Sequence, residues 1–160
     1  MTRIGITGHV HLTAATAELI RAALFERLRA CDDELVGVSC LAPGADSIFA
    51  DVVLALGGRL NVVLPAQHYR DRAVPAERVA VFDDLLARAA SVRVMPYAEP
   101  SPVAYRAANN AVLTDITRLV AVWDGSGGDT GSTADAVDAA RRRHIPIDIV
   151  WPTGARRGPE

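Results

Sequence analysis

The sequence predicts one α/β domain built on a single doubly wound, mainly parallel sheet of about six strands, with helices on both faces. Two observations predict this fold. Short apolar runs alternate with segments of helical periodicity along nearly the whole chain. The chain has 160 residues, of which 50% are hydrophobic, as expected for one domain with a sizeable core. We assign residues 1–151 to this domain and residues 152–160 to a loose C-terminal tail.

The expected strands are short, apolar and bounded by turn residues, and they cover residues 3–7, 34–39, 60–64, 92–95, 119–123 and 145–150. Thr13 is the expected N-cap of the first helix, and the later helices are expected at residues 46–56, 76–90, 103–115 and 132–143. Residues 67–72 are expected to form a polar loop. Right-handed crossovers then give a Rossmann-like sheet with strand order 3-2-1-4-5-6, and a ligand site near the switch between strands 1 and 4.

The charge of the chain argues against several partners and chemistries. The net charge is −2, so we expect no nucleic-acid partner, which usually needs a basic face. All 17 basic residues are arginine, which excludes a Walker A lysine and a Schiff-base lysine.

The cysteines and the hydropathy pattern indicate a cytoplasmic protein. Cys31 and Cys40 have the spacing of neither a zinc site nor a redox pair, so we expect buried free thiols in a reducing compartment. No apolar run is long enough to span a membrane, and no secretory signal is visible at the N-terminus. We therefore expect no membrane association.

The strongest local signal is the glycine-rich segment 124–131, which follows an expected strand and precedes an expected helix. Glycines allow a backbone to approach a ligand closely, and a helix N-terminus attracts anions. The segment therefore predicts a phosphate site formed by Asp124, Gly125, Thr130, Gly131, Ser132 and Thr133. The alternative is a flexible loop followed by an ordinary capped helix.

Three further segments reach the same edge of the expected sheet. Gly8 and His9 follow strand 1 and are expected to line a ligand pocket, although no GxGxxG motif supports NAD or FAD. A His-x-His metal site with His11 is the weaker alternative, because no acidic or histidine partners cluster elsewhere, and we predict neither a metal nor a cofactor.

The second and third of these segments follow strand 2 and precede strand 5. Gly44 and Asp46 follow strand 2, where Asp46 is expected to cap a helix and could contact a ribose or base. Arg106 and Asn109 share one helix face, which could contact either solvent or the ligand.

Together these segments resemble the SLOG superfamily, which includes the Lonely Guy phosphoribohydrolases and the DprA-like Rossmann domains, and the resemblance is closest to its small stand-alone bacterial members. The matching segments are residues 5–9, 44–46, 105–109, 120–125 and 131–135, in the expected order. The resemblance implies a nucleotide-type ligand over the strand ends and a homodimer. It also implies that Asp135 stands near the catalytic glutamate of the enzymes, and Arg106 one turn before the position of their arginine.

In the Lonely Guy enzymes a glutamate stands near the position of Asp135, and an arginine stands one turn after the position of Arg106. Because this chain differs at both positions, three functions remain open. The first is binding or sensing of a phosphate-bearing nucleotide or nucleotide derivative. The second is hydrolysis of a nucleoside 5′-monophosphate to base and ribose phosphate, with Asp135 and Arg106 as catalytic residues. The third is an oligomeric interaction domain with a vestigial pocket.

Overall fold

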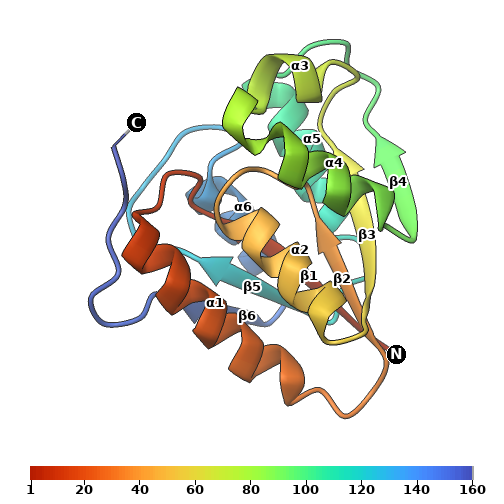
Figure 1. Ribbon diagram of the computed structural model, residues 1–160. Helices are drawn as coiled ribbons and strands as arrows, with labels where there is room; N and C mark the ends of the chain where they lie inside the picture. Colours follow the sequence, from red (N-terminus) through yellow and green to blue (C-terminus); the bar gives the residue numbers. More distant parts are fainter. Residues whose placement is uncertain (160) are drawn as a thin grey trace.

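Six parallel strands form one sheet between two layers of helices in the computed structural model, which describes residues 1–159 (Figure 1). The strands are β1 (Thr2–Gly8), β2 (Leu35–Ser39), β3 (Arg59–Leu64), β4 (Ser91–Val94), β5 (Arg118–Val122) and β6 (Ile147–Val150). The helices are α1 (Ala14–Arg29), α2 (Ala45–Ala55), α3 (Tyr69–Ala73), α4 (Val79–Ala87), α5 (Pro102–Val112) and α6 (Thr133–Arg142), and a 3₁₀ turn, η1 (Ala76–Arg78), precedes α4. The predicted Rossmann-like α/β fold is confirmed.

The strand order differs from the predicted 3-2-1-4-5-6, because β4 lies at the edge of the sheet. The order is β4-β3-β2-β1-β5-β6, so the winding reverses between β1 and β5. Val62 of β3 is in register with Val92 of β4, and Gly5 of β1 with Leu119 of β5. The crevice at the carboxyl ends of β1 and β5 is therefore the place where a doubly wound sheet offers a ligand site.

Helices cover both faces of the sheet (Figure 1), and apolar side chains on both faces of the strands hold the two helical layers. On one face, Ile20 and Leu24 of α1 and Phe49 of α2 pack against Ile4 and Ile6 of β1. Apolar residues of α4 extend this layer over β3. The opposite face is covered by α5 and α6. Because both faces are covered, the strand ends are the edge at which loops can form a cavity.

One local prediction was wrong. Residues 67–72 do not form a simple loop, because α3 begins at Tyr69, whose ring is buried against Phe82 and Leu64. In the C-terminal segment, the backbone of residues 156–158 is hydrogen-bonded to residues around the connection between β1 and α1. Arg156 N donates to Thr16 Oγ1 at 2.7 Å, and Gly158 N donates to His11 O at 2.7 Å.

Both cysteines are free thiols, with Cys40 buried and Cys31 half-buried. Within residues 1–159, no helix combines the length and the apolar character that crossing a bilayer requires. The cytoplasmic location stays a prediction.

Candidate functional site

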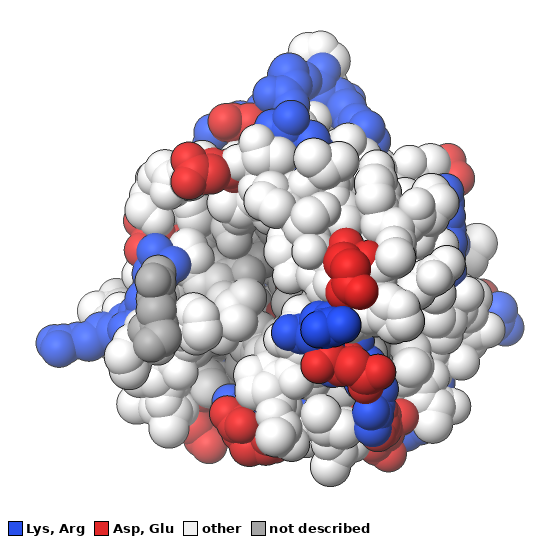
Figure 2. Space-filling model, turned by 90° about the horizontal axis from the view of Figure 1, so that it is seen from above, with Lys and Arg blue, Asp and Glu red and all other residues white. Residues whose placement is uncertain are grey.

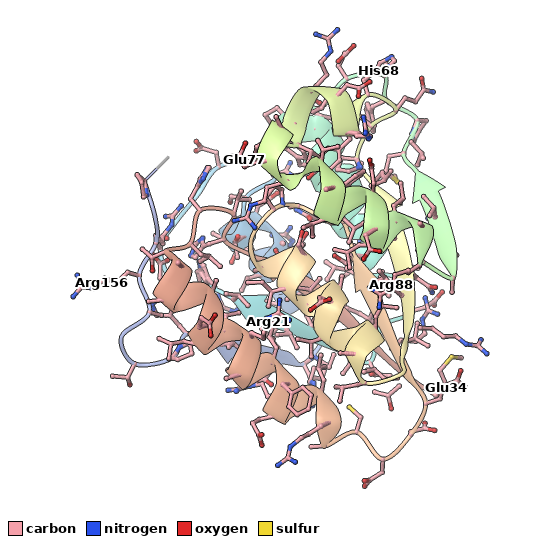
Figure 3. The ribbon with its side chains drawn as sticks, viewed as in Figure 1. Arg21, Glu34, His68, Glu77, Arg88 and Arg156 are labelled. Atoms are coloured by element: carbon pink, nitrogen blue, oxygen red, sulfur yellow. The ribbon has the colours of Figure 1, made fainter. Side chains whose placement is uncertain are left out.

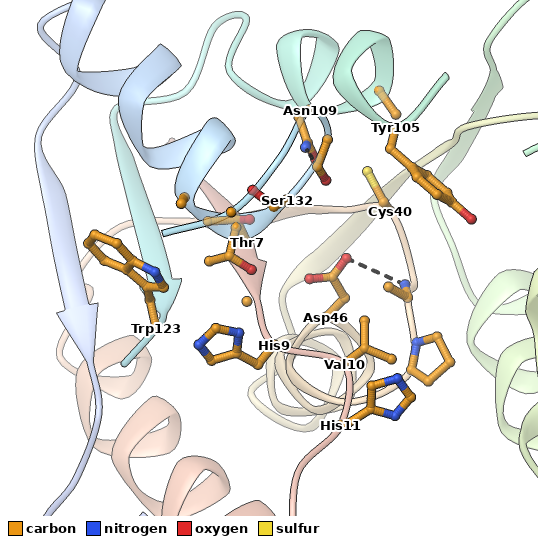
Figure 4. Close-up of a pocket in the computed structure, with 18 of the residues that line it drawn as sticks. Thr7, His9, Val10, His11, Cys40, Asp46, Tyr105, Asn109, Trp123 and Ser132 are labelled. Carbon is orange, nitrogen blue, oxygen red and sulfur yellow. Dashed lines mark hydrogen bonds between the residues drawn. The ribbon is translucent and has the colours of Figure 1, made fainter. Parts of the chain in front are cut away.

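A cavity of about 420 Å³ lies at the carboxyl ends of β1, β2 and β5. Figure 2 views this face of the molecule from above and shows a hollow with mostly uncharged atoms inside it. Figure 4 shows side chains from several strand ends and helices converging on the cavity. Its lining residues come from distant parts of the chain: Thr7, Gly8, His9, Val10, His11, Cys40, Ala42, Pro43, Asp46, Pro65, Tyr69, Ala73, Tyr105, Ala108, Asn109, Trp123, Ser126, Gly127, Gly128, Gly131, Ser132, Thr133, Ala134 and Arg157.

The N-terminus of α6 presents backbone amides to this cavity. Ser132 is the N-cap, and its side chain accepts a hydrogen bond from Asp135 N at 3.2 Å. The backbone N of Ser132 donates to Asp129 O, so it is occupied. The amides of Thr133 and Ala134, the first two of the helix, have no hydrogen-bond partner within the described residues. Both residues line the cavity, where the helix dipole favours an anion.

Gly131 is required for packing against α5. Its φ is +83°, and a Cβ atom there would lie 2.8 Å from Tyr105 Cβ and 2.9 Å from Pro102 O. Gly127 is different, because a Cβ atom at that position meets nothing within 4 Å and the residue also lines the cavity. Of these two glycines, Gly127 is therefore the one at which a side chain can be added without disturbing the protein itself.

His9 connects the ends of β1 and β5. Its ring is only 6% exposed, and its Nε2 atom lies 3.0 Å from Asp124 Oδ1 and accepts a hydrogen bond from Asp124 N at 3.1 Å. One ring nitrogen cannot accept from the amide and donate to the carboxylate at once. Because burial lowers the pKa of His9, outweighing its hydrogen bond to Asp124, the neutral ring that accepts from the amide fits this geometry.

Asp124 in turn organises the start of the glycine-rich loop. Its Oδ1 atom accepts a hydrogen bond from Ser126 N at 2.9 Å. Burial alone raises the pKa of Asp124, but the hydrogen bonds from the Ser126 side chain and backbone outweigh it and hold the pKa at about 2. Trp123 Nε1 donates to Ser126 O at 2.9 Å. Asp124 therefore orders the loop and is not a lining residue of the cavity.

Asp46 is the buried carboxyl group of the cavity. It was predicted to cap α2, but Gly44 occupies the N-cap and Asp46 lies in the first turn. Its Oδ2 atom accepts a long hydrogen bond from Ala42 N at 3.4 Å (Figure 4). Burial raises the pKa of Asp46 to about 7, against the smaller lowering effect of this hydrogen bond. Near neutral pH the group can therefore either donate or accept a hydrogen bond in the cavity.

Arg106 and Asp135, the two candidate catalytic residues, bind each other. Arg106 donates from Nε and Nη2 to the two carboxylate oxygens of Asp135, both at 3.0 Å. Asp135 Oδ2 also accepts from Gly131 N at 2.9 Å. The Arg106 hydrogen bond, more than the opposing effect of burial, lowers the pKa of Asp135. Neither residue lines the cavity, so the pair holds the loop against α5.

Asp135→Asn is expected to lower the midpoint of thermal unfolding by about 2–4 °C. The amide retains a weaker acceptor for Gly131 N, and the loss of about 1 kcal/mol corresponds to that shift for a chain of this size. Differential scanning calorimetry measures the midpoint. Base release from AMP, GMP, CMP and UMP should not differ from that of the unmodified protein. A fall in base release would instead show that Asp135 acts on a ribose.

The structure brings seven of the predicted site residues together around the cavity: Gly8, His9, Asp46, Asn109, Gly131, Ser132 and Thr133. It does not bring there Gly44, Asp124, Gly125, Thr130, Arg106 or Asp135. Asn109 Nδ2 lies 3.4 Å from Gly131 O and faces the cavity (Figure 4). The cavity is also lined by the aromatic residues Tyr69, Tyr105 and Trp123 and by Arg157, none of which was among the predicted site residues.

The described residues do not include a set of side chains arranged to bind a metal ion. Within residues 1–159, no group of three or more His, Cys, Asp or Glu side chains is placed to hold an ion. His11 lines the cavity, but His9 is engaged with Asp124.

The fold corresponds to that of several solved Rossmann-like proteins, so the predicted resemblance is confirmed as a likeness of fold. DNA processing protein A (DprA) from Streptococcus pneumoniae has 16% sequence identity and a TM-score of 0.68, over 96% of this chain and 52% of that chain. DprA from Helicobacter pylori has 16% identity and a TM-score of 0.68, over 98% of this chain and 68% of that one. The molybdenum cofactor binding protein from Rippkaea orientalis has 15% identity and a TM-score of 0.58, over 92% and 75%.

The chain spans about half the length of the Streptococcus pneumoniae DprA chain. No protein-family model matches the chain, and no curated protein matches it.

The expectation that nucleic acid is not a partner was wrong. The structure of Helicobacter pylori DprA, which shares the fold over 98% of this chain, is described for its mode of binding single-stranded DNA. Net charge cannot exclude such a partner, because it averages the whole surface while binding depends on local charge.

Proposed function

We propose that the protein binds a phosphate-bearing nucleotide or nucleotide-derived ligand in the cavity at the strand ends. The observation that carries the proposal is the meeting of the α6 N-terminus with the end of β1 in one cavity. The amides of Thr133 and Ala134 are available there to an anion, and Gly127, which lines the same cavity, allows close approach. A volume of about 420 Å³ lies within the usual range of small-molecule sites.

The remaining walls suit the base and the ribose. Tyr69 and Tyr105 present an edge-to-face pair with ring centroids 6.4 Å apart, and both line the cavity. Aromatic rings of this kind can stack on a base. Asp46, whose carboxyl group is buried beside them, can bond to a ribose hydroxyl or to a polar base edge.

Gly127→Val is expected to weaken binding of a nucleoside monophosphate by tenfold or more. The new side chain stays clear of protein atoms but occupies the space that the phosphate needs. Isothermal titration calorimetry with AMP, GMP, CMP and UMP measures the effect. Thr130→Val is the matched control in the same loop, because Thr130 does not line the cavity, and it should retain affinity within about twofold.

Failure of all four nucleotides to bind the unmodified protein, together with no nucleotide among co-purifying small molecules in mass spectrometry, would contradict the proposal. A single-stranded oligodeoxynucleotide belongs in the same titration series, because a protein of this fold binds single-stranded DNA. If the oligonucleotide competes with a nucleotide for binding, the cavity would be assigned to the end of a DNA strand.

Phosphoribohydrolase activity gains no support from the geometry. The carboxylate and guanidinium that would carry it are bound to each other outside the cavity. The binding proposal therefore stands ahead of the enzymatic one.

A further inference from the structure

The C-terminal segment carries an arginine to the cavity. Arg157 is a lining residue although it lies 24 positions after Thr133, the first residue of α6, in a segment whose composition indicated a loose tail. Its backbone forms an isolated antiparallel bridge with Leu12. On either side of it, Arg156 N is bonded to Thr16 Oγ1 and Gly158 N to His11 O. Arg157 is thus held at both flanks against the connection that leaves β1.

Arg157 is the single arginine among the residues that line the cavity within the described part of the chain. The chain contains no lysine that could supply the charge instead. Arg106, which the sequence predicted as a catalytic residue, forms an ion pair with Asp135. Among residues 1–159, no carboxylate forms an ion pair with Arg157.

The positive charge of Arg157 acts on His9, a buried residue of the cavity. This charge contributes, after burial, to lowering the pKa of His9. A lowered pKa disfavours the protonated form of His9. Arg157 is therefore the positively charged side chain that can bind an anion in this cavity. A guanidinium carries a full positive charge and can bind two oxygens of one phosphate through parallel N–H donors, whereas backbone amides carry only partial charges.

We propose that Arg157 binds the phosphate of the ligand, together with the amides of Thr133 and Ala134, so that the C-terminal segment is part of the binding site. This inference rests on the proposed function and names the residue that recognises the ligand's charge. It places recognition of the phosphate on two elements, α6 and the C-terminal segment, both anchored beside β1.

The test compares Arg157→Ala with Arg156→Ala in the full chain. Arg156 is adjacent and exposed, and its side chain projects away from the fold (Figure 3). Calorimetric titration with AMP, GMP, CMP and UMP, and with the matching unphosphorylated nucleosides, separates the phosphate contribution from that of the base. Arg157→Ala should weaken nucleotide binding by tenfold or more and leave nucleoside binding unchanged, whereas Arg156→Ala should change neither by more than about twofold.

The outcomes separate the inference from the proposed function. Equal nucleotide affinity in Arg157→Ala and the unmodified protein, with binding lost in Gly127→Val, would overturn the role of Arg157 and retain the phosphate site. If Arg156→Ala weakened nucleotide binding as much as Arg157→Ala, the loss would be due to general charge attraction, and the inference would also be overturned. Absence of nucleotide binding in the unmodified protein would overturn both proposals. Thermal unfolding of each variant verifies that the fold is retained.

Discussion

Gly44→Ala is expected to lower the free energy of unfolding by about 3 kcal/mol or more. Gly44 has φ +86° and ψ −127°, a backbone conformation that is almost confined to glycine. A Cβ atom there would lie 2.4 Å from Val10 O and 2.7 Å from His9 O, both backbone atoms. Strain of about 1–3 kcal/mol and overlap of similar size therefore combine.

Urea unfolding followed by circular dichroism measures this loss. Gly57→Ala is the control, because Gly57 also has a positive φ, of +76°, but a Cβ atom there meets nothing within 4 Å. The control should cost about 1 kcal/mol, the price of backbone strain alone. If both variants lost the same stability, close approach at Gly44 would not be needed to seat α2 beside His9.

The order of the strands near β1 was predictable only in part. The regular alternation of apolar strands and helices determines a doubly wound sheet, and it correctly places a switch beside β1. The predicted order placed strand 4 next to strand 1 in the interior of the sheet, whereas β5 is the neighbour of β1 and β4 is an edge strand. Arg93 in the middle of β4 was the available signal, since a charged residue in a short strand is typical of a sheet edge. Val92 and Val94 are 46% and 45% exposed, as expected for that edge.

The candidate site was predictable where a local pattern carries the function. The glycine-rich loop and the helix that follows it formed such a pattern, and Ser132 and Thr133 line the cavity. Side chains that depend on tertiary contacts could not be inferred in this way. Arg157 reaches the cavity through backbone bonds to residues about 140 positions earlier, such as Thr16. Arg106 and Asp135 were each visible in the sequence, but their mutual ion pair was not.

Asp46→Asn is expected to stabilise the protein relative to the unmodified chain at pH 8 by on the order of 4 kcal/mol. In the folded protein, burial raises the pKa of Asp46 from its ordinary value of 3.8 to about 7. Between these two values the unfolded chain releases the proton while the folded protein keeps it. Stability attributable to Asp46 is therefore full below pH 4, falls by about 1.4 kcal/mol per pH unit as pH rises towards 7, and is constant above that.

An asparagine at position 46 removes this dependence, because its amide has no charge to desolvate and its oxygen can still accept from Ala42 N. Chemical unfolding at pH 5 and pH 8 should show the advantage of the variant growing by about 3 kcal/mol, the product of roughly two pH units and 1.4 kcal/mol. Asp51→Asn, on the same helix with a 44% exposed side chain, is the control and should change by less than about 1 kcal/mol. An advantage that does not grow with pH would mean that Asp46 is ionised in the folded protein at pH 5, and that the cavity contains a carboxylate and not a neutral donor at the pH where a ligand binds.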